Sequence, residues 1–331
     1  MISTDRTAAV ELLRKGELVA LPTETVYGLA ADALNPIAVA KIFEAKERPR
    51  FDPLIVHLPN REWLDRIVDL PAHDRQLILK LADKFWPGPF TIVLQKREIV
   101  PDLVTAGLDT VAVRISAHPV FAEIVCELEE PLAAPSANRF GRVSPTTAEH
   151  VLDELEGRIP LIIDAGPTEH GIESTIVALH DGGLEILRRG PITESQLAES
   201  AEITTSAPQA EKVSAPGQLP SHYAPKTPLR LIDDAVAFAP QKQQRVGLLA
   251  WHPKSGDLQM AQRRTGDRRS LRFAEVRNLS VRQDLREAAA NLFRYMRELD
   301  ALGLDLIVAE RVPLHGLGAA IMDRLERASH R

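Results

Sequence analysis

Apolar and polar positions in the first two thirds of the chain alternate between the two-residue period of strands and the wider spacing of helices. Short apolar runs, many rich in β-branched residues, predict strands at 17–21, 54–58, 90–94, 110–115, 161–164, 174–179 and 184–187. Amphipathic segments predict helices at 4–14, capped by Ser3 or Thr4, at 36–45, with Asn35 as cap and Pro36 as first residue, and at 119–128. Residues 66–85 are expected to form one or two helices. One more helix is expected to open at Ser144 and Pro145, with the serine as N-cap. Strands and helices mixed without strict βαβ alternation predict an α/β or α+β fold with a largely mixed sheet.

The pattern changes after about residue 198, where Ser, Thr, Ala and Pro replace periodic apolar positions. Beyond this segment, strands are expected at 229–233, 246–250 and 306–309, and helices at 284–302 and 319–328. We therefore predict a first domain at 1–200, a Pro-rich linker at 201–228 and a smaller α/β domain at 229–331.

Composition narrows the class of protein. The chain has 331 residues, a net charge of -6 and one cysteine, Cys126, which excludes a disulfide framework and a cysteine zinc site. No apolar run is long enough to span a bilayer, and residues 1–15 lack the apolar core of a signal peptide. The expected location is the cytoplasm, without a membrane partner.

A tight basic cluster is the first candidate site. Lys46, Arg48 and Arg50 occupy alternate positions after a predicted helix, so they can converge on one polyanion. Taken alone, a solvated charged turn is the more common explanation for such a cluster.

Polar residues at predicted strand ends offer further candidates. Thr23, Thr25 and Tyr27 follow a strand, where hydroxyl groups can bind a ligand or simply stabilise a turn. Arg114 lies inside a strand, so its charge needs either a salt-bridge partner or an anionic ligand. Ser174 opens another strand, and its hydroxyl can equally be satisfied by backbone groups.

Other candidates are weaker when taken singly. The loop with Ser136 and Asn138 can bind a nucleotide or act as a plain turn, and Arg188 by itself is expected to be solvated. His57 and His118 lack the companions of a metal site, so no metal-binding residues are predicted. The chain has no G-x-x-x-x-G-K-[ST] phosphate loop.

The order of these motifs closely resembles that of the YrdC/Sua5 family over about residues 5–195. The matching segments are Pro22-Thr-Glu-Thr-Val-Tyr-Gly-Leu29, Lys46-x-Arg48-Pro49, Pro53-Leu-Ile-Val-His57, Pro87-Gly-Pro89, Val113-Arg-Ile115, His118-Pro119, Ala134-Pro-Ser-Ala-Asn138, Ser144-Pro-Thr-Thr147, Glu173-Ser-Thr175 and Leu187-Arg188. Ser221-His-Tyr-Ala-Pro225, Asn291-Leu-Phe293, Gly316-Leu-Gly-Ala-Ala-Ile321 and Arg324-Leu325 resemble the two-domain Sua5 form.

The resemblance implies a twisted mixed sheet around a central cavity, followed by a Rossmann-like second domain. It also implies L-threonylcarbamoyladenylate synthase, a nucleotidyltransferase that uses L-threonine, bicarbonate and ATP with Mg²⁺. The product serves the N6-threonylcarbamoyl modification of adenosine 37 in tRNA, so tRNA and the proteins that transfer this group are candidate partners.

The family match also implies site roles. Catalysis is assigned to Lys46 and Arg48. ATP binding is assigned to Lys46, Arg48, Arg50, Ser136, Asn138, Ser144, Arg188 and Tyr223. Threonine binding is assigned to Thr23, Tyr27, His57, Arg114 and Ser174. A lid from the linker is assigned to His222 and Tyr223, whose other interpretation is a spacer.

The chain departs from the family pattern at a few positions. The usual Gly after the motif lysine is Glu47, the frequent Asn before Pro-Leu is Asp52, and the common R-I-P ends in Ser116. The basic, aromatic run that often precedes the His-Tyr pair reads Gly217-Gln-Leu-Pro-Ser221.

The main alternative function is a double-stranded RNA or tRNA-binding module of the same fold without synthase activity. Residues 263–286 carry eight arginines against three acidic residues, so they are a candidate RNA-binding surface, although a solvated, flexible surface stretch explains this run at least as well.

Overall fold

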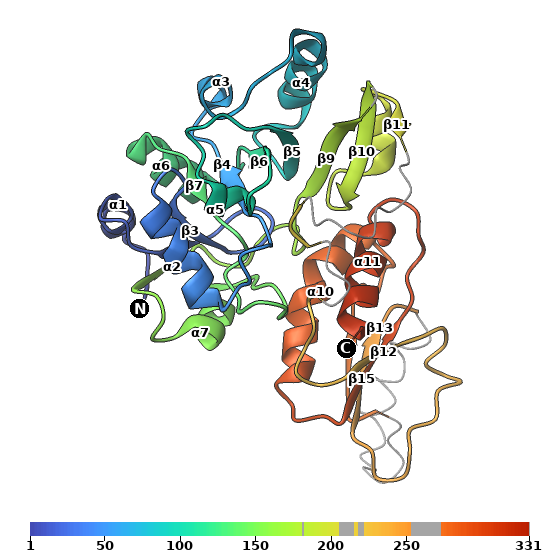
Figure 1. Cartoon of the computed structure of the whole chain (residues 1–331). Coiled ribbons are helices and arrows are strands. Elements are labelled where there is room, and N and C mark those ends of the chain that lie inside the picture. The colour runs from blue at the N-terminus through green and yellow to red at the C-terminus, as the bar shows by residue number, and fades with distance from the viewer. Residues whose placement is uncertain (181, 205–214, 218–221, 253–272, 331) are drawn as a thin grey trace. The chain divides into compact units, whose positions relative to one another are not determined.

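The computed structural model describes residues 1–180, 182–204, 215–217, 222–252 and 273–330. The chain divides into two compact units (Figure 1). The first comprises Met1–Phe140 and Ser144–Leu219, and the second comprises Gly141–Val143 and Pro220–Arg331. Of the helices in the described part, none combines the length and apolar character that a membrane span requires.

The first unit is built on one twisted, mixed sheet, which has eleven strands within the described residues. In spatial order these are β1 (Ile2–Ser3), β8 (Leu161–Ile163), β2 (Val19–Leu21), β3 (Gly28–Asp32), β7 (Leu132–Ala133), β4 (Ile55–His57), β6 (Thr110–Arg114), β5 (Phe90–Gln95), β9 (Thr175–His180), β10 (Gly183–Arg188) and β11 (Ile203–Thr204). Parallel pairs such as β4–β6 and β5–β9 are mixed with antiparallel pairs such as β5–β6 and β9–β10. The prediction of a mixed α/β sheet is confirmed.

Helices cover both faces of this sheet. They are α1 (Arg6–Arg14), α2 (Pro36–Lys46), α3 (Leu64–Ile67), α4 (Ala72–Phe85), α5 (Asp102–Thr105), α6 (Pro119–Leu128), α7 (Ala148–Leu155) and α8 (Glu194–Ala198), with a 3-10 turn η1 (Arg61–Trp63). Successive strand residues point to opposite faces, so β2 sends Ala20 into the core that contains α2 and α4. Its neighbours Val19 and Leu21 enter a second core with α1 and α6, which lie side by side (Figure 1).

The sequence predicted some helix starts correctly and others wrongly. Asn35 caps α2 through its side chain and Pro36 occupies the first turn, as expected. The cap of α1 is Asp5, not Ser3 or Thr4, because the Asp5 side chain accepts the backbone N–H of Ala8. The helix expected at Ser144 starts at Ala148 with Thr147 as cap, because the Ser144 hydroxyl donates to Glu173 instead.

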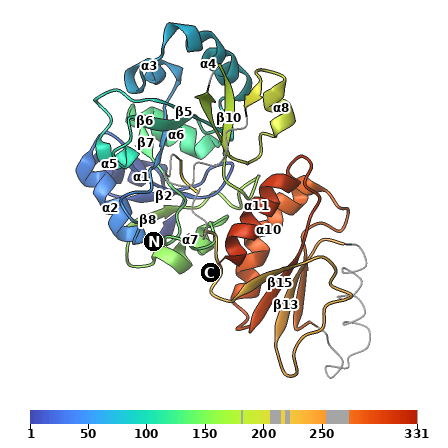
Figure 2. The ribbon, with the colours of Figure 1, turned by 45° about the vertical axis from the view of Figure 1, so that its right-hand side comes forward.

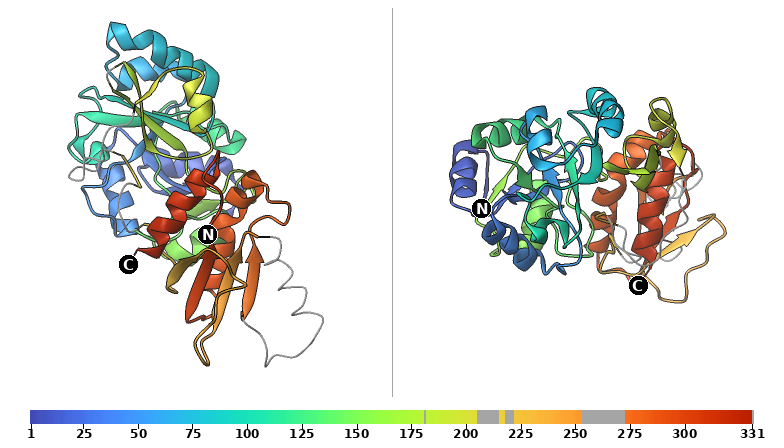
Figure 3. Two further views of the ribbon diagram at one scale, coloured as in Figure 1. Left: turned by 90° about the vertical axis from the view of Figure 1, so that its right-hand side faces the viewer. Right: turned by 45° about the horizontal axis from the view of Figure 1, so that its top comes forward.

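The second unit is a small α/β layer structure. Its strands β12 (Leu229–Ile232), β15 (Leu306–Glu310), β13 (Val246–Ala250) and β14 (Glu275–Asn278) form a parallel sheet in that order. The long helices α10 (Leu285–Asp300) and α11 (Gly318–Ser329) pack beside each other along the sheet (Figures 2 and 3). Helix α10 buries a stripe that includes Leu292, Phe293 and Met296 and leaves its charged side at least partly accessible to solvent, as its amphipathic pattern predicts.

Candidate active site

The sheet topology of the first unit brings several predicted site residues to one end of neighbouring strands. Strands β4 and β6 are parallel and in register, so their last residues, His57 and Arg114, are paired. Strand β10 runs antiparallel to β9, and its end at Arg188 therefore lies beside the start of β9, next to Ser174. Residues from distant parts of the sequence thus meet at one sheet edge.

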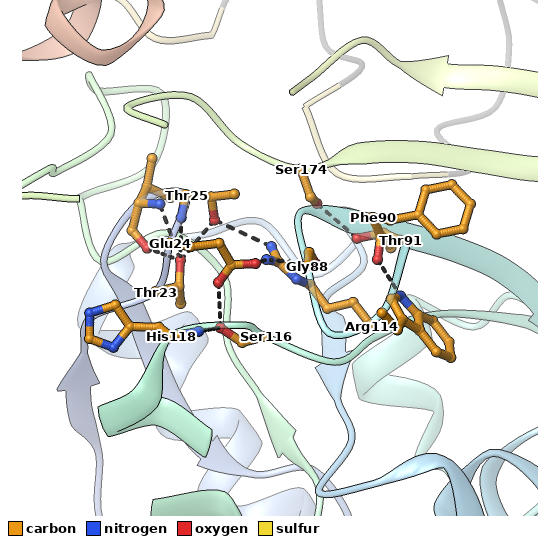
Figure 4. A network of polar contacts seen from close by, with 12 residues as sticks. Thr23, Glu24, Thr25, Gly88, Phe90, Thr91, Arg114, Ser116, His118 and Ser174 are labelled. Carbon is orange, nitrogen blue, oxygen red and sulfur yellow. Dashed lines mark hydrogen bonds and ion pairs between the residues drawn. The ribbon is translucent and has the colours of Figure 1, made fainter. Parts of the chain in front are cut away.

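The turn between β2 and β3 is stabilised by its threonines. The Thr23 hydroxyl oxygen accepts the backbone N–H groups of Thr25 at 3.1 Å and Val26 at 3.2 Å, and it donates to the Val26 carbonyl at 2.6 Å. Thr23 therefore performs the turn chemistry that the sequence left as one of two explanations. Thr25 faces the site, with its hydroxyl 3.3 Å from Nη1 of Arg114 (Figure 4).

Arg114 has a protein carboxylate as its partner. Its Nη2 donates to Glu24 and, at 3.4 Å, to the Gly88 carbonyl oxygen, and both members of the ion pair are buried. The Ser116 hydroxyl donates to the other Glu24 oxygen (Figure 4). Burial alone would raise the pKa of Glu24, but Arg114 and Ser116 outweigh it and hold the pKa below its usual value. Glu24 and Gly88 therefore hold the Arg114 guanidinium group from one side.

His57 lies beside this cation as a neutral imidazole. Burial, and then the positive charge of Arg114, lower the pKa of His57 well below its usual value. The ring packs against Phe121 with centroids 4.7 Å apart, and Nδ1 has no hydrogen-bond partner among the described residues. A buried neutral ring with a vacant nitrogen is suited to hydrogen bonding with a small polar ligand.

Ser174 and Arg188 link the groups predicted for two different substrates. The Ser174 hydroxyl lies 2.8 Å from Thr91 Oγ1 and accepts from Nη2 of Arg188 at 3.0 Å. Arg188 also donates from Nε to the Ser174 carbonyl at 3.0 Å and from Nη1 to the Pro216 carbonyl at 3.3 Å. The expectation of a solvated Arg188 is wrong, because its side chain is buried and holds backbone oxygens.

The basic cluster splits into buried and exposed members. Lys46 ends helix α2, since Glu47 adopts a left-handed φ of 53°, and its ammonium group donates to the carbonyl oxygens of Ser136 and Asn138. Burial, followed by the charge of Arg48, lowers the pKa of Lys46 well below its usual value. Lys46 thus cross-links the end of α2 to the 136–138 loop.

Arg48 is the second buried cation of this cluster. It pairs with Asp52 at 2.9 Å and donates to the Pro53 carbonyl at 2.8 Å, whereas Arg50 is exposed. Burial raises the pKa of Asp52, and the nearby Arg48 and Lys46 oppose this rise. A fully solvated turn is therefore excluded for Lys46 and Arg48, and Asp52 places a carboxylate among these cations.

The hydroxyl groups of two predicted site residues, Tyr27 and Ser144, form hydrogen bonds with other residues of the first unit. The Tyr27 hydroxyl donates to the Gly166 carbonyl at 2.8 Å and accepts from the Ala165 N–H at 3.3 Å, and burial raises the pKa of its phenol. The buried Ser144 hydroxyl donates to the Glu173 carboxylate. Both contacts hold loops of the first unit in place.

The predicted lid residues belong to the second unit. The Tyr223 ring stacks on Phe293 with centroids 5.4 Å apart, and the buried Arg324 guanidinium lies 5.3 Å from the Tyr223 ring centre. His222 contacts Tyr223 edge-on at 4.1 Å. The lid function stays a prediction, but the Tyr223 ring packs against Phe293 of α10 and Arg324 of α11.

Sequence reasoning missed three acidic residues of the site. Glu24, Asp52 and Glu173 each pair with a residue that had been predicted to bind substrate. Each of them is a carboxylate within a segment of polar motif residues that is otherwise apolar enough to be buried. Because a buried charge requires a partner, this pattern could have identified them. Which partner it finds depends on the fold.

The candidate RNA-binding arginine run lies partly outside the described residues, which omit 263–272. Within the described part, Arg277 is engaged in ion pairs with Glu275 and Glu298. Arg282 and Arg286 are exposed.

The neutral buried state of His57 predicts a pH dependence of stability. Because the unfolded chain binds a proton at His57 below about pH 6.5 and the folded chain does not, the free energy of unfolding should fall as pH drops below 6.5 toward the lowered pKa. In His57→Asn, the slope of the free energy of unfolding against pH should be smaller by up to about 1.4 kcal/mol per pH unit. Denaturant unfolding measured between pH 7 and 5 will show this difference. The exposed His73→Asn serves as control, and equal slopes in wild type and His57→Asn would contradict a neutral His57.

Comparisons with known proteins place this geometry in a family context. The family model Sua5/YciO/YrdC, described as "Telomere recombination", matches residues 11–190, and the model "Threonylcarbamoyl-AMP synthase, C-terminal domain" matches residues 192–330. The threonylcarbamoyl-AMP synthase of Pyrococcus abyssi is 37% identical over 97% of this chain and 93% of its own length. That of Bacillus subtilis is 40% identical over 97% of this chain and 92% of its own length. The crystal structure of P. abyssi Sua5 complexed with L-threonine superposes with a TM-score of 0.82, covering 98% of this chain and 94% of that one.

Proposed function

The chain belongs to the Sua5/YrdC family, and we propose that it is a threonylcarbamoyl-AMP synthase acting as a nucleotidyltransferase. Its substrates are L-threonine, bicarbonate and ATP, and its products are threonylcarbamoyl-AMP and pyrophosphate. The hydrogen bond between Ser174 and Arg188 carries the residue-level proposal, because it joins a predicted threonine contact to a predicted nucleotide contact at 3.0 Å. Two substrates that react with each other need such adjacent pockets.

The reaction has two bond-forming stages. The free amine of threonine combines with bicarbonate, losing water, to give a carbamate. A carbamate oxygen then attacks the α-phosphorus of ATP. The bond from this phosphorus to the oxygen that bridges it to the β-phosphorus breaks, and pyrophosphate leaves. Negative charge spreads over the transferring phosphoryl group, so positioned cations supply most of the stabilisation.

The residues at the ends of β4 and β6 fit the threonine side of this reaction. The cationic Arg114 is suited to the substrate carboxylate, and the neutral His57 can hold the amine or hydroxyl by a hydrogen bond. Thr25 and Ser174 add hydroxyl groups at the same edge. Thr23 and Tyr27 are proposed to act by shaping this pocket, because their hydroxyl groups contact the protein itself.

The buried cations fit the nucleotide side. We assign Lys46 and Arg48, with the exposed Arg50, to the phosphates, and Ser136, Asn138, Ser144 and Arg188 to the remaining nucleotide contacts. Mg²⁺ is proposed to enter with the ATP phosphates as part of the substrate. Within the described residues, no group of three or more His, Cys, Asp or Glu side chains is arranged to hold a metal ion.

Threonylcarbamoyl-AMP is a mixed anhydride, so its consumer must be an enzyme that transfers the threonylcarbamoyl group. We propose that this serves N6-threonylcarbamoylation of adenosine 37 in tRNA, with the transferring proteins as partners. Residues 1–200 are proposed as the catalytic domain, 201–228 as linker and lid, and 229–331 as the second domain. No described feature favours the alternative of an RNA-binding module without synthase activity.

The function is tested by product identification. The purified full chain should convert L-threonine, bicarbonate and ATP to threonylcarbamoyl-AMP, detected by mass spectrometry, with pyrophosphate released in equal amount. Leaving out threonine should abolish both signals. Salt-sensitive binding of tRNA without any threonine-dependent product would overturn the proposal in favour of the binding module.

A further inference from the structure

Glu24 is a buried carboxylate to which the proposed reaction gives no part. Its side chain is 5% exposed, and it lies in the turn between β2 and β3. The Thr23 hydroxyl holds this turn from within, and the Glu24 carbonyl accepts the backbone N–H of His170 at 2.9 Å. The backbone that carries the Glu24 carboxylate is thus fixed on two sides.

The carboxylate itself is also held at several points. One oxygen accepts from Nη2 of Arg114 and the other from the Ser116 hydroxyl (Figure 4). Its donors therefore define one position for the charge.

Arg114 is constrained on the Glu24 side and open elsewhere. Its Nη2 is engaged by Glu24 and Gly88, whereas Nη1 has only the 3.3 Å contact with Thr25 among the described residues. Nε has no partner within the same part of the chain, although the side chain is only 3% exposed. A buried guanidinium N–H without a partner is costly, so it is a donor that a ligand can satisfy with gain.

We propose that Glu24 is a positioning residue for L-threonine recognition: it anchors Nη2 of Arg114 so that Nε and Nη1 stay available to the substrate carboxylate. This rests on the proposed function, in which Arg114 binds threonine. Without Glu24, the long side chain of Arg114 would lose its rotamer freedom only when the substrate binds, and this loss of entropy would weaken binding. Glu24 removes this loss before binding, and Ser116 keeps Glu24 itself in place.

The test is L-threonine binding to the full chain by titration calorimetry. Glu24→Gln keeps the size of the side chain and removes its charge, and it should weaken threonine binding about tenfold while ATP binding changes less than about twofold. Glu123→Gln is the control, because Glu123 forms an ion pair with Arg6 at the exposed surface. Ser116→Ala should give a smaller loss for threonine, about twofold to threefold.

A double-mutant cycle separates positioning from mere stability. If Glu24 acts through Arg114, Glu24→Gln should have less than about a twofold effect on threonine binding in an Arg114→Lys background. Effects that simply add, equal losses for threonine and ATP, or unchanged threonine binding in both Glu24→Gln and Ser116→Ala would overturn the inference. If Arg114→Lys alone leaves threonine binding unchanged, the failure lies instead in the proposed threonine site. Thermal unfolding of each variant reports whether it is folded, and Ser116→Ala carries the test if Glu24→Gln is not.

Discussion

Lys46→Ala is expected to lower the kcat of threonylcarbamoyl-AMP formation about 10²-fold to 10³-fold. The ammonium group is buried and donates to the carbonyl oxygens of Ser136 and Asn138. Its removal takes a cation from the proposed phosphate site and releases the loop that we assign to the nucleotide. Both losses act on the transition state, so kcat should suffer more than the KM for threonine.

A matched control lies on the same helix. Lys41 of α2 donates to the Gly16 carbonyl at 2.8 Å and pairs with Glu17 at 2.9 Å at the protein surface, so Lys41→Ala should retain activity. Product formation should be followed by mass spectrometry and folding by thermal unfolding. Near-normal turnover of a folded Lys46→Ala protein would remove Lys46 from the mechanism.

Arg188→Ala is expected to reduce kcat/KM for both ATP and threonine, each by about 10²-fold. Its guanidinium holds the Ser174 hydroxyl and carbonyl as well as the Pro216 carbonyl, so its removal leaves these buried acceptors without that donor. Because Ser174 is assigned to threonine and Arg188 to the nucleotide, one substitution should disturb both pockets.

The neighbouring residue supplies the control for this prediction. Arg189 is exposed and pairs with the surface carboxylate of Glu194 at 3.4 Å, so Arg189→Ala should behave as wild type. Steady-state kinetics with each substrate varied in turn will separate the two effects. A loss confined to ATP would show that Ser174 keeps its place without Arg188, and a loss confined to threonine would remove Arg188 from the nucleotide site.

Local sequence patterns determined much of the secondary structure. Helix α6 begins and ends where the pattern predicted, and Asn35 with Pro36 marked the start of α2. These features depend on neighbouring residues only, because capping and helical periodicity act within a few positions. Strand β3 (Gly28–Asp32) was missed, since its Gly and Ala residues lack strand propensity and its pairing with β2 and β7 decides its conformation.

The identity of the candidate site also came from the sequence, through the order of its motifs. That order was enough to name Lys46, Arg114, Ser174 and Arg188, although each alone had an ordinary structural explanation that was equally good or better. Family order along the chain replaced the missing spatial information.

Only the tertiary structure decided which charges are paired. Glu24 meets Arg114 across 90 positions, and Lys46 reaches the carbonyl of Asn138 across 92, because strand order places their segments together. Burial, together with the charge of Arg114, then lowers the pKa of His57, whereas Arg114 at the same sheet edge is paired with Glu24. The sequence by itself therefore determined which groups this protein carries, whereas long-range packing determined their partners, since sheet pairing between distant strands leaves no local signal.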